Sequence, residues 1–370
     1  MLFCCLIAFK KTGGIEKFNR CFAQAMSSFL GTHHLQFRMF SLYDKAADNR
    51  YVSSRNFKGF KGNKFLFLWR SLLALRNIDM LYLGHINLAL LVVLVKLVKP
   101  KVHICLVVHG IEAWYPVSRL KAKALRLCDS FVTVSNFSSA KLISVHHVPA
   151  SKITIVPNTI DPNIFNKTDI NTSVLKNFYA ITTEHNVLIT VARFAHSERL
   201  KGYETVLKVI RKMKLENRKV VYLMVGDYEP REKRRLEHLA ATLEISDNVH
   251  FTGYIEDDLL PDYYQMSDVF VMPSKKEGFG IVFIEALASG LGVVAGENDG
   301  SVDALNGGKF GYLVNPDDVE EVKQAVLDAL NSKVDRSSRI EEVYNAFGFG
   351  VFKKKIIQHL LHSYTCAKVS

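Results

Sequence analysis

The residues best suited to chemistry lie in one stretch, Met272–Val294, with the sequence MPSKKEGFGIVFIEALASGLGVV. A strand is expected to end at the start of this stretch, and a glycine-rich loop then opens a helix near Gly280. The loop residues Gly278, Phe279 and Gly280 supply no capping side chain, so the first amides of the helix, such as that of Ile281, keep free hydrogens. Because a helix start carries partial positive charge, this one suits a phosphate.

Two glutamates flank the helix start. Glu277 lies in the loop, and Glu285 follows eight positions later, about two turns into the helix. We expect both carboxylates to face the carboxyl edge of a parallel sheet, where they can accept hydroxyl protons from a sugar or a ribose. The alternative is an exposed loop glutamate and an ordinary helix-capping glutamate.

Two cations precede this stretch. Arg193 ends the apolar run VLITVAR, and Lys201 stands before Gly202 at the start of the next helical segment. Strand ends and helix starts meet at the same edge of a parallel sheet, so both charges can converge on a diphosphate. A solvated surface charge is the alternative for either residue alone.

The whole chain reads as a folded α/β protein. Its 370 residues are 48% hydrophobic and 23% charged, which predicts two domains with their own cores. Apolar runs such as Leu2–Ala8, His103–Val108 and Val220–Val225 alternate with helical segments, a pattern typical of doubly wound parallel sheets. A polar break is expected near Asp161–Thr183. The six cysteines show no metal-ligand or redox spacing and are interpreted as free thiols.

Further motifs stand in a consistent order around these residues. They are KKTGGIEKF, VHGIEAW, VTVSNFS, IVPNTIDPNIF, VGD, VHFTGYI and SDVFVMPS. Together with the EGFG loop, its second glutamate and the R…KG pair, they resemble the family 4 retaining glycosyltransferases over essentially the whole chain. The resemblance implies the GT-B fold, with two Rossmann-like doubly wound parallel-sheet domains facing each other across a cleft. It places an acceptor domain at 1–165, to which a C-terminal helix of about 348–370 returns, and a nucleotide-sugar domain at 175–345.

In the second domain, the resemblance assigns a role to each candidate residue. Glu285 would bind the ribose hydroxyls and Glu277 the hydroxyls of the transferred sugar. Arg193 and Lys201 would neutralise the diphosphate as the glycosidic bond breaks, which requires neither a metal ion nor a cofactor. The backbone amides of Phe279, Gly280 and Ile281 would add hydrogen-bond donors.

In the first domain, the resemblance places His109 opposite the donor sugar, and a structural histidine is the alternative. Gly13 and Gly14 would let the backbone pass close to the donor and the acceptor. Two features depart from the family pattern: Ala192 stands where glycine is frequent, and the segment Glu297–Leu305 (ENDGSVDAL) replaces a glycine-rich turn. The identity of the sugar therefore cannot be carried over.

The charge of the chain is unevenly distributed. Residues 1–163 contain 22 Lys and Arg against 7 Asp and Glu, and the remainder contains 26 against 29. An anionic partner is therefore expected for the first half. The stretch Arg55–Arg70 mixes cations with aromatic residues, as at the interface of an anionic membrane, and its candidate contacts are Lys58, Lys61, Lys64 and Trp69. A solvated loop with an ordinary amphipathic helix is the alternative, and no nucleic-acid motif accompanies these residues.

The expected function is transfer of a sugar, with retention of configuration, from a nucleotide-sugar to a saccharide or lipid-linked acceptor in bacterial envelope polysaccharide or lipopolysaccharide assembly. A sugar-nucleotide epimerase on the same fold, or a non-catalytic sugar-nucleotide-binding protein, is the alternative. No signal peptide or membrane-spanning segment is expected, since the apolar stretch Ile86–Val98 is shorter than the roughly 20 residues a span needs. The expected location is the cytoplasm, with or without peripheral contact at the inner face of the plasma membrane.

Overall fold

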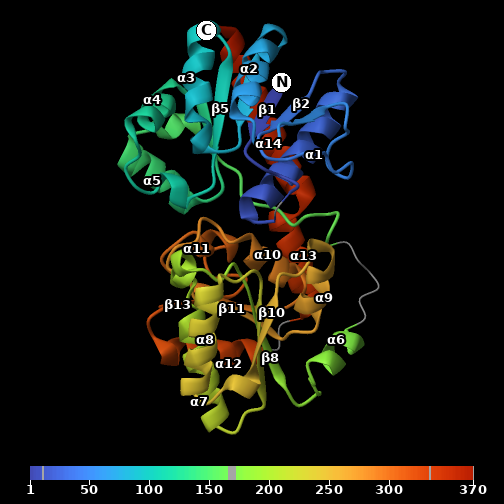
Figure 1. Cartoon of the computed structure of the whole chain (residues 1–370), viewed down its shortest axis with the longest axis vertical. Coiled ribbons are helices and arrows are strands. Elements are labelled where there is room, and N and C mark those ends of the chain that lie inside the picture. Colours follow the sequence, from blue (N-terminus) through green and yellow to red (C-terminus); the bar gives the residue numbers. More distant parts are fainter. Residues whose placement is uncertain (11, 166–171, 333–334, 370) are drawn as a thin grey trace. The chain divides into compact units, whose positions relative to one another are not determined.

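The computed structural model describes residues 1–10, 12–165, 172–332 and 335–369 (Figure 1). It divides into two compact units. Unit 1 contains Met1–Asp161 and Phe347–Ser370, and unit 2 contains Pro162–Ala346. Part of the polar break predicted between the domains, residues 166–171, lies outside the described residues. Each unit is described by itself below.

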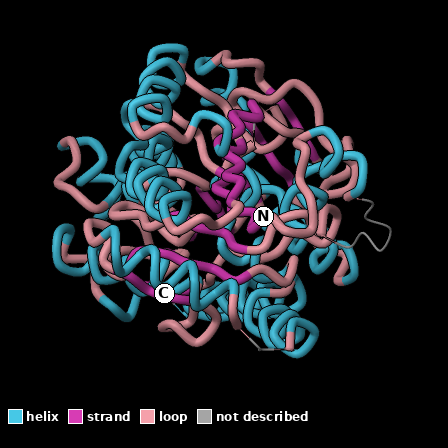
Figure 2. The backbone as a smooth tube through the Cα atoms, turned by 90° about the horizontal axis from the view of Figure 1, so that it is seen from below, coloured by secondary structure: helices cyan, strands magenta, loops and turns pink. Residues whose placement is uncertain are grey.

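Unit 1 is built on a seven-stranded parallel sheet in the order β3-β2-β1-β4-β5-β6-β7. In the view of Figure 2, helices surround the strands. Its strands are β1 (Leu2–Cys5), β2 (Arg38–Ser41), β3 (Phe57–Gly59), β4 (Met80–Leu83), β5 (His103–Val108), β6 (Ser130–Thr133) and β7 (Ile153–Ile155). Its helices are α1 (Gly14–Thr32), α2 (Lys64–Ala74), α3 (Ala89–Val98), α4 (Arg119–Leu127), α5 (Asn136–His146) and α14 (Phe349–Val369).

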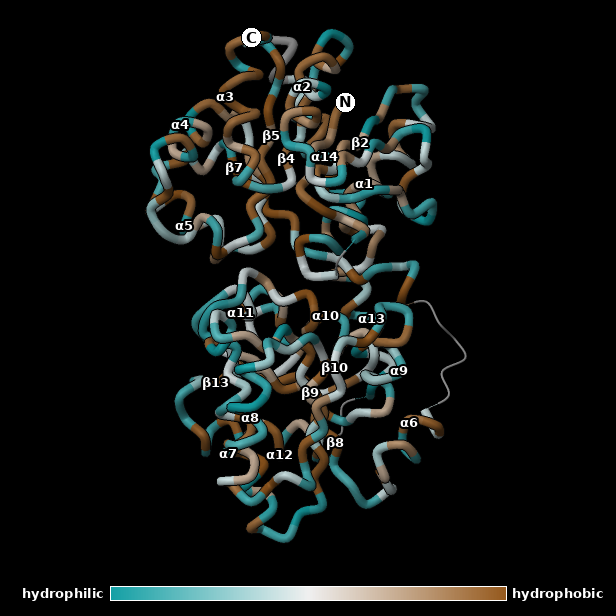
Figure 3. Tube along the Cα trace, in the orientation of Figure 1, coloured by the Kyte–Doolittle hydropathy of each residue, from teal (hydrophilic) through white to brown (hydrophobic). Residues whose placement is uncertain are grey.

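Hydrophobic runs account for the central elements of unit 1. All six residues of β5 are buried, and both β5 and α3 stand out as hydrophobic stretches in Figure 3. The helix α14, from the end of the chain, packs on α1 and β5. Its buried His359 has Nε2 3.3 Å from Sγ of Cys105 and Nδ1 3.0 Å from Oγ1 of Thr154. These contacts fix the C-terminal helix on the sheet of unit 1.

The first strand is shorter than predicted, ending at Cys5 instead of near Ala8. The cause is the buried carboxylate of Asp44, which accepts backbone hydrogens from Ala8 (2.7 Å), Phe9 (3.1 Å) and Lys10 (2.7 Å). Amides bonded to a side chain cannot take part in a strand ladder, so the chain turns into a loop here. The apolar pattern alone gives no sign of this partner.

Unit 2 is built on a six-stranded parallel sheet in the order β10-β9-β8-β11-β12-β13. Its strands are β8 (Asn186–Val191), β9 (Val220–Val225), β10 (Val249–Gly253), β11 (Val269–Met272), β12 (Gly292–Gly296) and β13 (Tyr312–Val314). Its helices are α6 (Ser173–Phe178), α7 (Tyr203–Leu215), α8 (Pro230–Thr242), α9 (Leu260–Gln265), α10 (Ile281–Ala288), α11 (Ser301–Ala304), α12 (Val319–Leu330) and α13 (Arg336–Phe347). The prediction of two doubly wound parallel-sheet domains is confirmed.

Candidate active site

The strand order of unit 2 reverses direction between β8 and β11, which are hydrogen-bonded neighbours. Ligands of doubly wound sheets bind outside the carboxyl ends of the strands at such a point. Arg193 lies two residues beyond β8, and the loop that contains Glu277 follows β11. The residues selected from the sequence therefore meet at this edge of unit 2.

Lys201 and Glu277 form an ion pair, with Nζ 2.9 Å from Oε2. The short helix η5 (His196–Lys201) carries Lys201, and Gly202 after it has φ +80°. A Cβ at Gly202 would lie 2.1 Å from the carbonyl oxygen of Pro273, so only glycine allows η5 to approach the end of β11 this closely. Burial lowers the pKa of Lys201, but Glu277 and Glu198 outweigh it, and the pKa is raised above its usual value. The lysine stays charged.

Arg193 is more accessible than Lys201 and Glu277, with 62% of its side chain exposed. Its guanidinium lies 2.7 Å from a carboxylate oxygen of Glu198, whose other oxygen lies 3.9 Å from Nζ of Lys201. Glu198 was not among the residues predicted from the sequence, because nothing in its local context separates it from an ordinary helix-start glutamate. Two cations and two carboxylates thus alternate at this edge, and a diphosphate would take the place of the carboxylates beside the cations.

The backbone of the Glu277 loop is held by Asp299, which the sequence analysis also missed. Asp299 is 1% exposed, and its Oδ2 accepts the backbone hydrogen of Glu277 (2.7 Å) and the hydroxyl of Ser274 (2.7 Å). Its Oδ1 accepts the amide hydrogen of Ser301 at 2.9 Å. Asp299 belongs to the segment ENDGSVDAL, which departs from the family pattern. In the structure, the hydrogen bonds of Asp299 hold the loop that carries Glu277 in place.

Replacing Asp299 with asparagine is expected to lower kcat/KM for the donor roughly 10- to 150-fold, since a buried charge-assisted hydrogen bond contributes about 1.5–3 kcal/mol. Burial raises the pKa of Asp299, although its bonds with Ser301 and Ser274 oppose the shift. Steady-state kinetics and thermal unfolding measure the effect. The control is Glu297→Gln, an exposed carboxylate of the same segment. A lower melting temperature with unchanged kinetic constants would assign Asp299 a purely structural role.

The helix α10 begins as predicted at the glycine-rich loop. Gly280, its N-cap, has φ +82° and makes no side-chain cap hydrogen bond, and Gly278 and Phe279 before it are buried. Ile281 is the first helical residue. Glu285 is fully buried, and its Oε2 accepts the hydroxyl hydrogen of Tyr264 at 3.1 Å. Tyr264 could not be expected as a partner from the sequence, and the ribose contact of Glu285 stays a prediction.

The candidates of unit 1 lie near the carboxyl ends of β1, β4 and β5. Gly13 is the N-cap of α1 in an extended conformation, and Gly14 is the first residue of that helix. His109 is buried, and its Nε2 donates to the carbonyl of Gly84 at 3.0 Å. Burial lowers the pKa of His109 to about 4, so the ring is neutral at pH 7. Its contact with the donor sugar stays a prediction.

The basic and aromatic stretch is divided between core and surface. Phe60 and Phe67 are buried in the core of unit 1, so not all aromatic residues of this stretch are accessible to a membrane. The ring of Phe60 packs against those of Phe40 and Phe67, with ring centres 5.4 and 5.3 Å apart. Lys61, Lys64 and Trp69 are exposed, and Lys58 is half-buried with Nζ 5.8 Å from the ring centre of Phe60.

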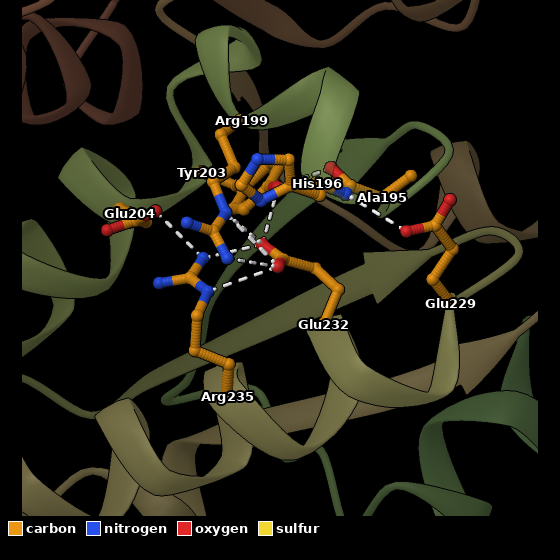
Figure 4. Close-up of polar contacts among 8 residues, drawn as sticks. All are labelled: Ala195, His196, Arg199, Tyr203, Glu204, Glu229, Glu232 and Arg235. Atoms are coloured by element: carbon orange, nitrogen blue, oxygen red, sulfur yellow. Dashed lines mark hydrogen bonds and ion pairs between the residues drawn. The ribbon is translucent and has the colours of Figure 1, made fainter.

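A buried ionic cluster fixes the segment that carries Lys201. Arg199 of η5 and Arg235 of α8 both point at the carboxylate of Glu232, which is 2% exposed (Figure 4). The nearest contacts are 2.8 Å from Arg199 and 2.6 Å from Arg235, and the hydroxyl of Tyr203 donates at 2.9 Å. Since Arg199 precedes Lys201 by two residues, the cluster positions the catalytic candidate.

Two family models match the chain, Glycosyltransferase Family 4 over residues 12–164 and Glycosyl transferases group 1 over residues 172–346. The chain belongs to the family 4 glycosyltransferases. Among the residues that the structure describes, no group of three or more His, Cys, Asp or Glu side chains is arranged to hold a metal ion. No helix within the same described ranges is long and apolar enough to cross a membrane.

Individual relatives in the family are distant. A GDP-mannose-dependent alpha-(1-6)-phosphatidylinositol monomannoside mannosyltransferase of Mycobacterium tuberculosis is 28% identical over 60% of this chain and 59% of its own length. Mannosylfructose-phosphate synthase of Agrobacterium fabrum is 28% identical over 53% of this chain and 44% of its own. The chain thus spans about half the length of these two relatives.

The fold agrees with the family. The structure of Anabaena Alr3699/HepE in complex with UDP aligns with a TM-score of 0.76 at 17% identity, covering 98% of this chain and 100% of the other. At this identity, the alignment shows a shared fold. The prediction of a GT-B fold with two Rossmann-like domains is confirmed for this family 4 chain.

Proposed function

We propose that this chain is a glycosyltransferase that takes a sugar from a nucleotide-sugar donor and transfers it with retention of configuration. The observation that supports this most is the set of charges at the switch point of unit 2. There Arg193 and Lys201 stand beside Glu277, at the edge where parallel sheets bind nucleotides. Cations suit the diphosphate and a carboxylate suits sugar hydroxyls, so one edge holds both halves of a nucleotide-sugar.

The chemistry that these residues support is departure of a nucleoside diphosphate. Charge grows on the phosphate oxygens as the glycosidic bond breaks, and the fixed cations Arg193 and Lys201 stabilise that charge. This role requires no metal ion, so we propose that activity persists in EDTA. For retention, we propose substitution on one face of the sugar, with the leaving phosphate assisting deprotonation of the acceptor. NMR of the anomeric proton in the first product tests the stereochemistry, and an inverted product would refute this proposal.

The decisive experiment is nucleotide binding by calorimetry, with UDP, GDP, ADP and dTDP added to the full chain without metal. Replacing Glu285 with alanine is expected to weaken the preferred nucleotide roughly 10- to 150-fold, because a charge-assisted ribose contact contributes about 1.5–3 kcal/mol. Glu237→Ala, on the exposed side of α8, is the control and should bind as the wild type does. Equal binding by the Glu285 variant, or binding of none of the four nucleotides by the wild type, would contradict the proposed donor site.

The two alternative functions predict different products. An epimerase would change a sugar-nucleotide in the absence of any acceptor, whereas a transferase would release the nucleoside diphosphate. A non-catalytic binding protein should have lost some of the candidate residues, and the chain retains all of His109, Arg193, Lys201, Glu277 and Glu285.

For the acceptor, we propose a saccharide or lipid-linked saccharide in bacterial envelope polysaccharide or lipopolysaccharide assembly, used in the cytoplasm. The support is the basic character of unit 1 and the phosphatidylinositol mannoside named for the mycobacterial relative. Thin-layer chromatography of lipid extracts after incubation with labelled donor tests this, and label in water-soluble glycans alone would refute the lipid-linked acceptor.

A further inference from the structure

The helix α2 presents an apolar stripe to solvent. Phe65, Trp69 and Leu73 are 81%, 48% and 40% exposed and follow each other at intervals of four, which places them on one face of the helix. The opposite face is already used, since Phe67 and Ser71 are buried in unit 1. The stripe is therefore not the core-facing side of an amphipathic helix.

A second exposed apolar group lies at the end of the neighbouring helix α3. Leu97 and Val98 are 73% and 64% exposed, and α3 packs beside α2. Lys99 joins the two helix ends, because its Nζ donates to the carbonyl oxygens of Leu75 (2.9 Å) and Ile78 (2.8 Å). The end of α3 thus lies near the end of α2 that carries Leu73. Exposed apolar side chains gathered in one region mark a contact with a partner or a membrane.

The charges around this surface select the partner. Lys64 begins α2 and is exposed, and the guanidinium of Arg70 lies 5.1 Å from the ring centre of Trp69. Unit 1 as a whole has 26 Lys and Arg against 7 Asp and Glu, whereas unit 2 has 22 against 29. Such a positive surface attracts anionic lipid head groups and repels a second copy of itself.

We propose that the face formed by Phe65, Trp69 and Leu73 of α2, with Leu97 and Val98 of α3, docks on an anionic lipid bilayer. Aromatic and aliphatic side chains insert between head groups while the flanking cations meet lipid phosphates. This surface shares Lys64 and Trp69 with the one expected from the sequence and adds Phe65, Leu73 and the end of α3. This docking rests on the proposed function in one respect only, which is that docking would bring unit 1 to a lipid-linked acceptor.

Sedimentation of the full chain with phosphatidylcholine vesicles, with and without phosphatidylglycerol, tests the proposal. Wild type is expected to bind only the anionic vesicles, and less at high salt. The variant Phe65→Ser/Trp69→Ser/Leu73→Ser is expected to lose roughly tenfold or more in partitioning. Lys64→Gln/Arg70→Gln is expected to lose about 25-fold, from about fivefold per cation. The control is Phe178→Ser, which removes a ring that is 78% exposed in the acidic unit 2.

Three results would overturn the proposal: wild type that ignores anionic vesicles at low salt, a triple variant that binds them as wild type does, or a triple variant that changes only self-association. The Lys64→Gln/Arg70→Gln variant keeps the apolar surface intact. It therefore tests the proposal even if the triple variant does not fold. Calorimetry of nucleotide binding on the same proteins reports the proposed function separately. Vesicle binding without nucleotide binding would refute that function and leave the docking surface standing.

Discussion

Replacing Lys201 with methionine is expected to lower kcat by about 10²–10³, the usual cost of removing one fixed donor from a developing negative charge. Lys201 is held charged by Glu277 and Glu198, and it lies at the switch point where the diphosphate is proposed to bind. The loss should fall on kcat more than on the affinity for the free nucleoside diphosphate, because the charge that it stabilises grows during bond cleavage.

Lys275→Met is the matched control for Lys201. Lys275 lies in the loop after β11 and pairs with Asp317, but its side chain is 40% exposed and points to a different carboxylate. Its replacement should leave kcat within about twofold of the wild type, as expected for an exposed ion pair. Steady-state kinetics with the donor that calorimetry selects make the comparison. Equal losses in the two variants would show that Lys201 has no special role in the reaction.

Replacing Glu232 with glutamine is expected to destabilise unit 2 by about 1.5–3 kcal/mol, because it removes the negative charge that accepts hydrogen bonds from Arg199 and Arg235. Arg235 keeps its second partner, Glu204, at 2.8 Å. Urea unfolding of the full chain at pH 7 measures the free energy. Hydrogen exchange of amides in His196–Leu215 shows whether the loss reaches the segment that carries Lys201. Glu237→Gln on the same helix is the control, since Glu237 is 48% exposed and should change stability by at most about 0.5 kcal/mol.

The same glutamate predicts a pH dependence. Burial alone would raise the pKa of Glu232, but hydrogen bonds from Arg235, Arg199 and Tyr203 outweigh it and lower the pKa to about 2, from 4.5. A carboxyl with a depressed pKa contributes stability that is present above pH 4.5 and is lost as the pH falls toward 2. Acid titration of the unfolding free energy should show this loss in wild type and a flatter curve for Glu232→Gln. Parallel curves would show that the cluster carries no such linkage.

Much of the architecture follows from the sequence. Continuous apolar runs such as His103–Val108 and Val220–Val225 are typical of strands buried on both faces, and the helical segments between them favour parallel pairing. The position of Arg193 after one strand and of Glu277 after another then fixes them at the carboxyl edge. Their meeting there was predictable because the geometry of a parallel sheet brings strand ends together.

The contacts made by side chains from distant parts of the chain were not predictable. Asp44 ends β1 early, Asp299 holds the Glu277 loop, and Tyr264 donates to Glu285 across 21 positions of sequence. Each is a single polar residue in an unremarkable local context, so periodicity and motif spacing contain no signal for it.

The sequence by itself determined the fold class, the family and the residues at the switch point of unit 2, because these depend on hydrophobic period and on local order along the chain. Only the tertiary structure decided which aromatic rings of Arg55–Arg70 are exposed, since burial depends on what packs against each helix face. It also decided that Glu198 and Glu277 neutralise the cations of the site, and that Arg199 and Arg235 meet on Glu232. The strength of a charge pair depends on the distance between the two groups in space, and for residues far apart in the sequence that distance is known only once the chain is folded.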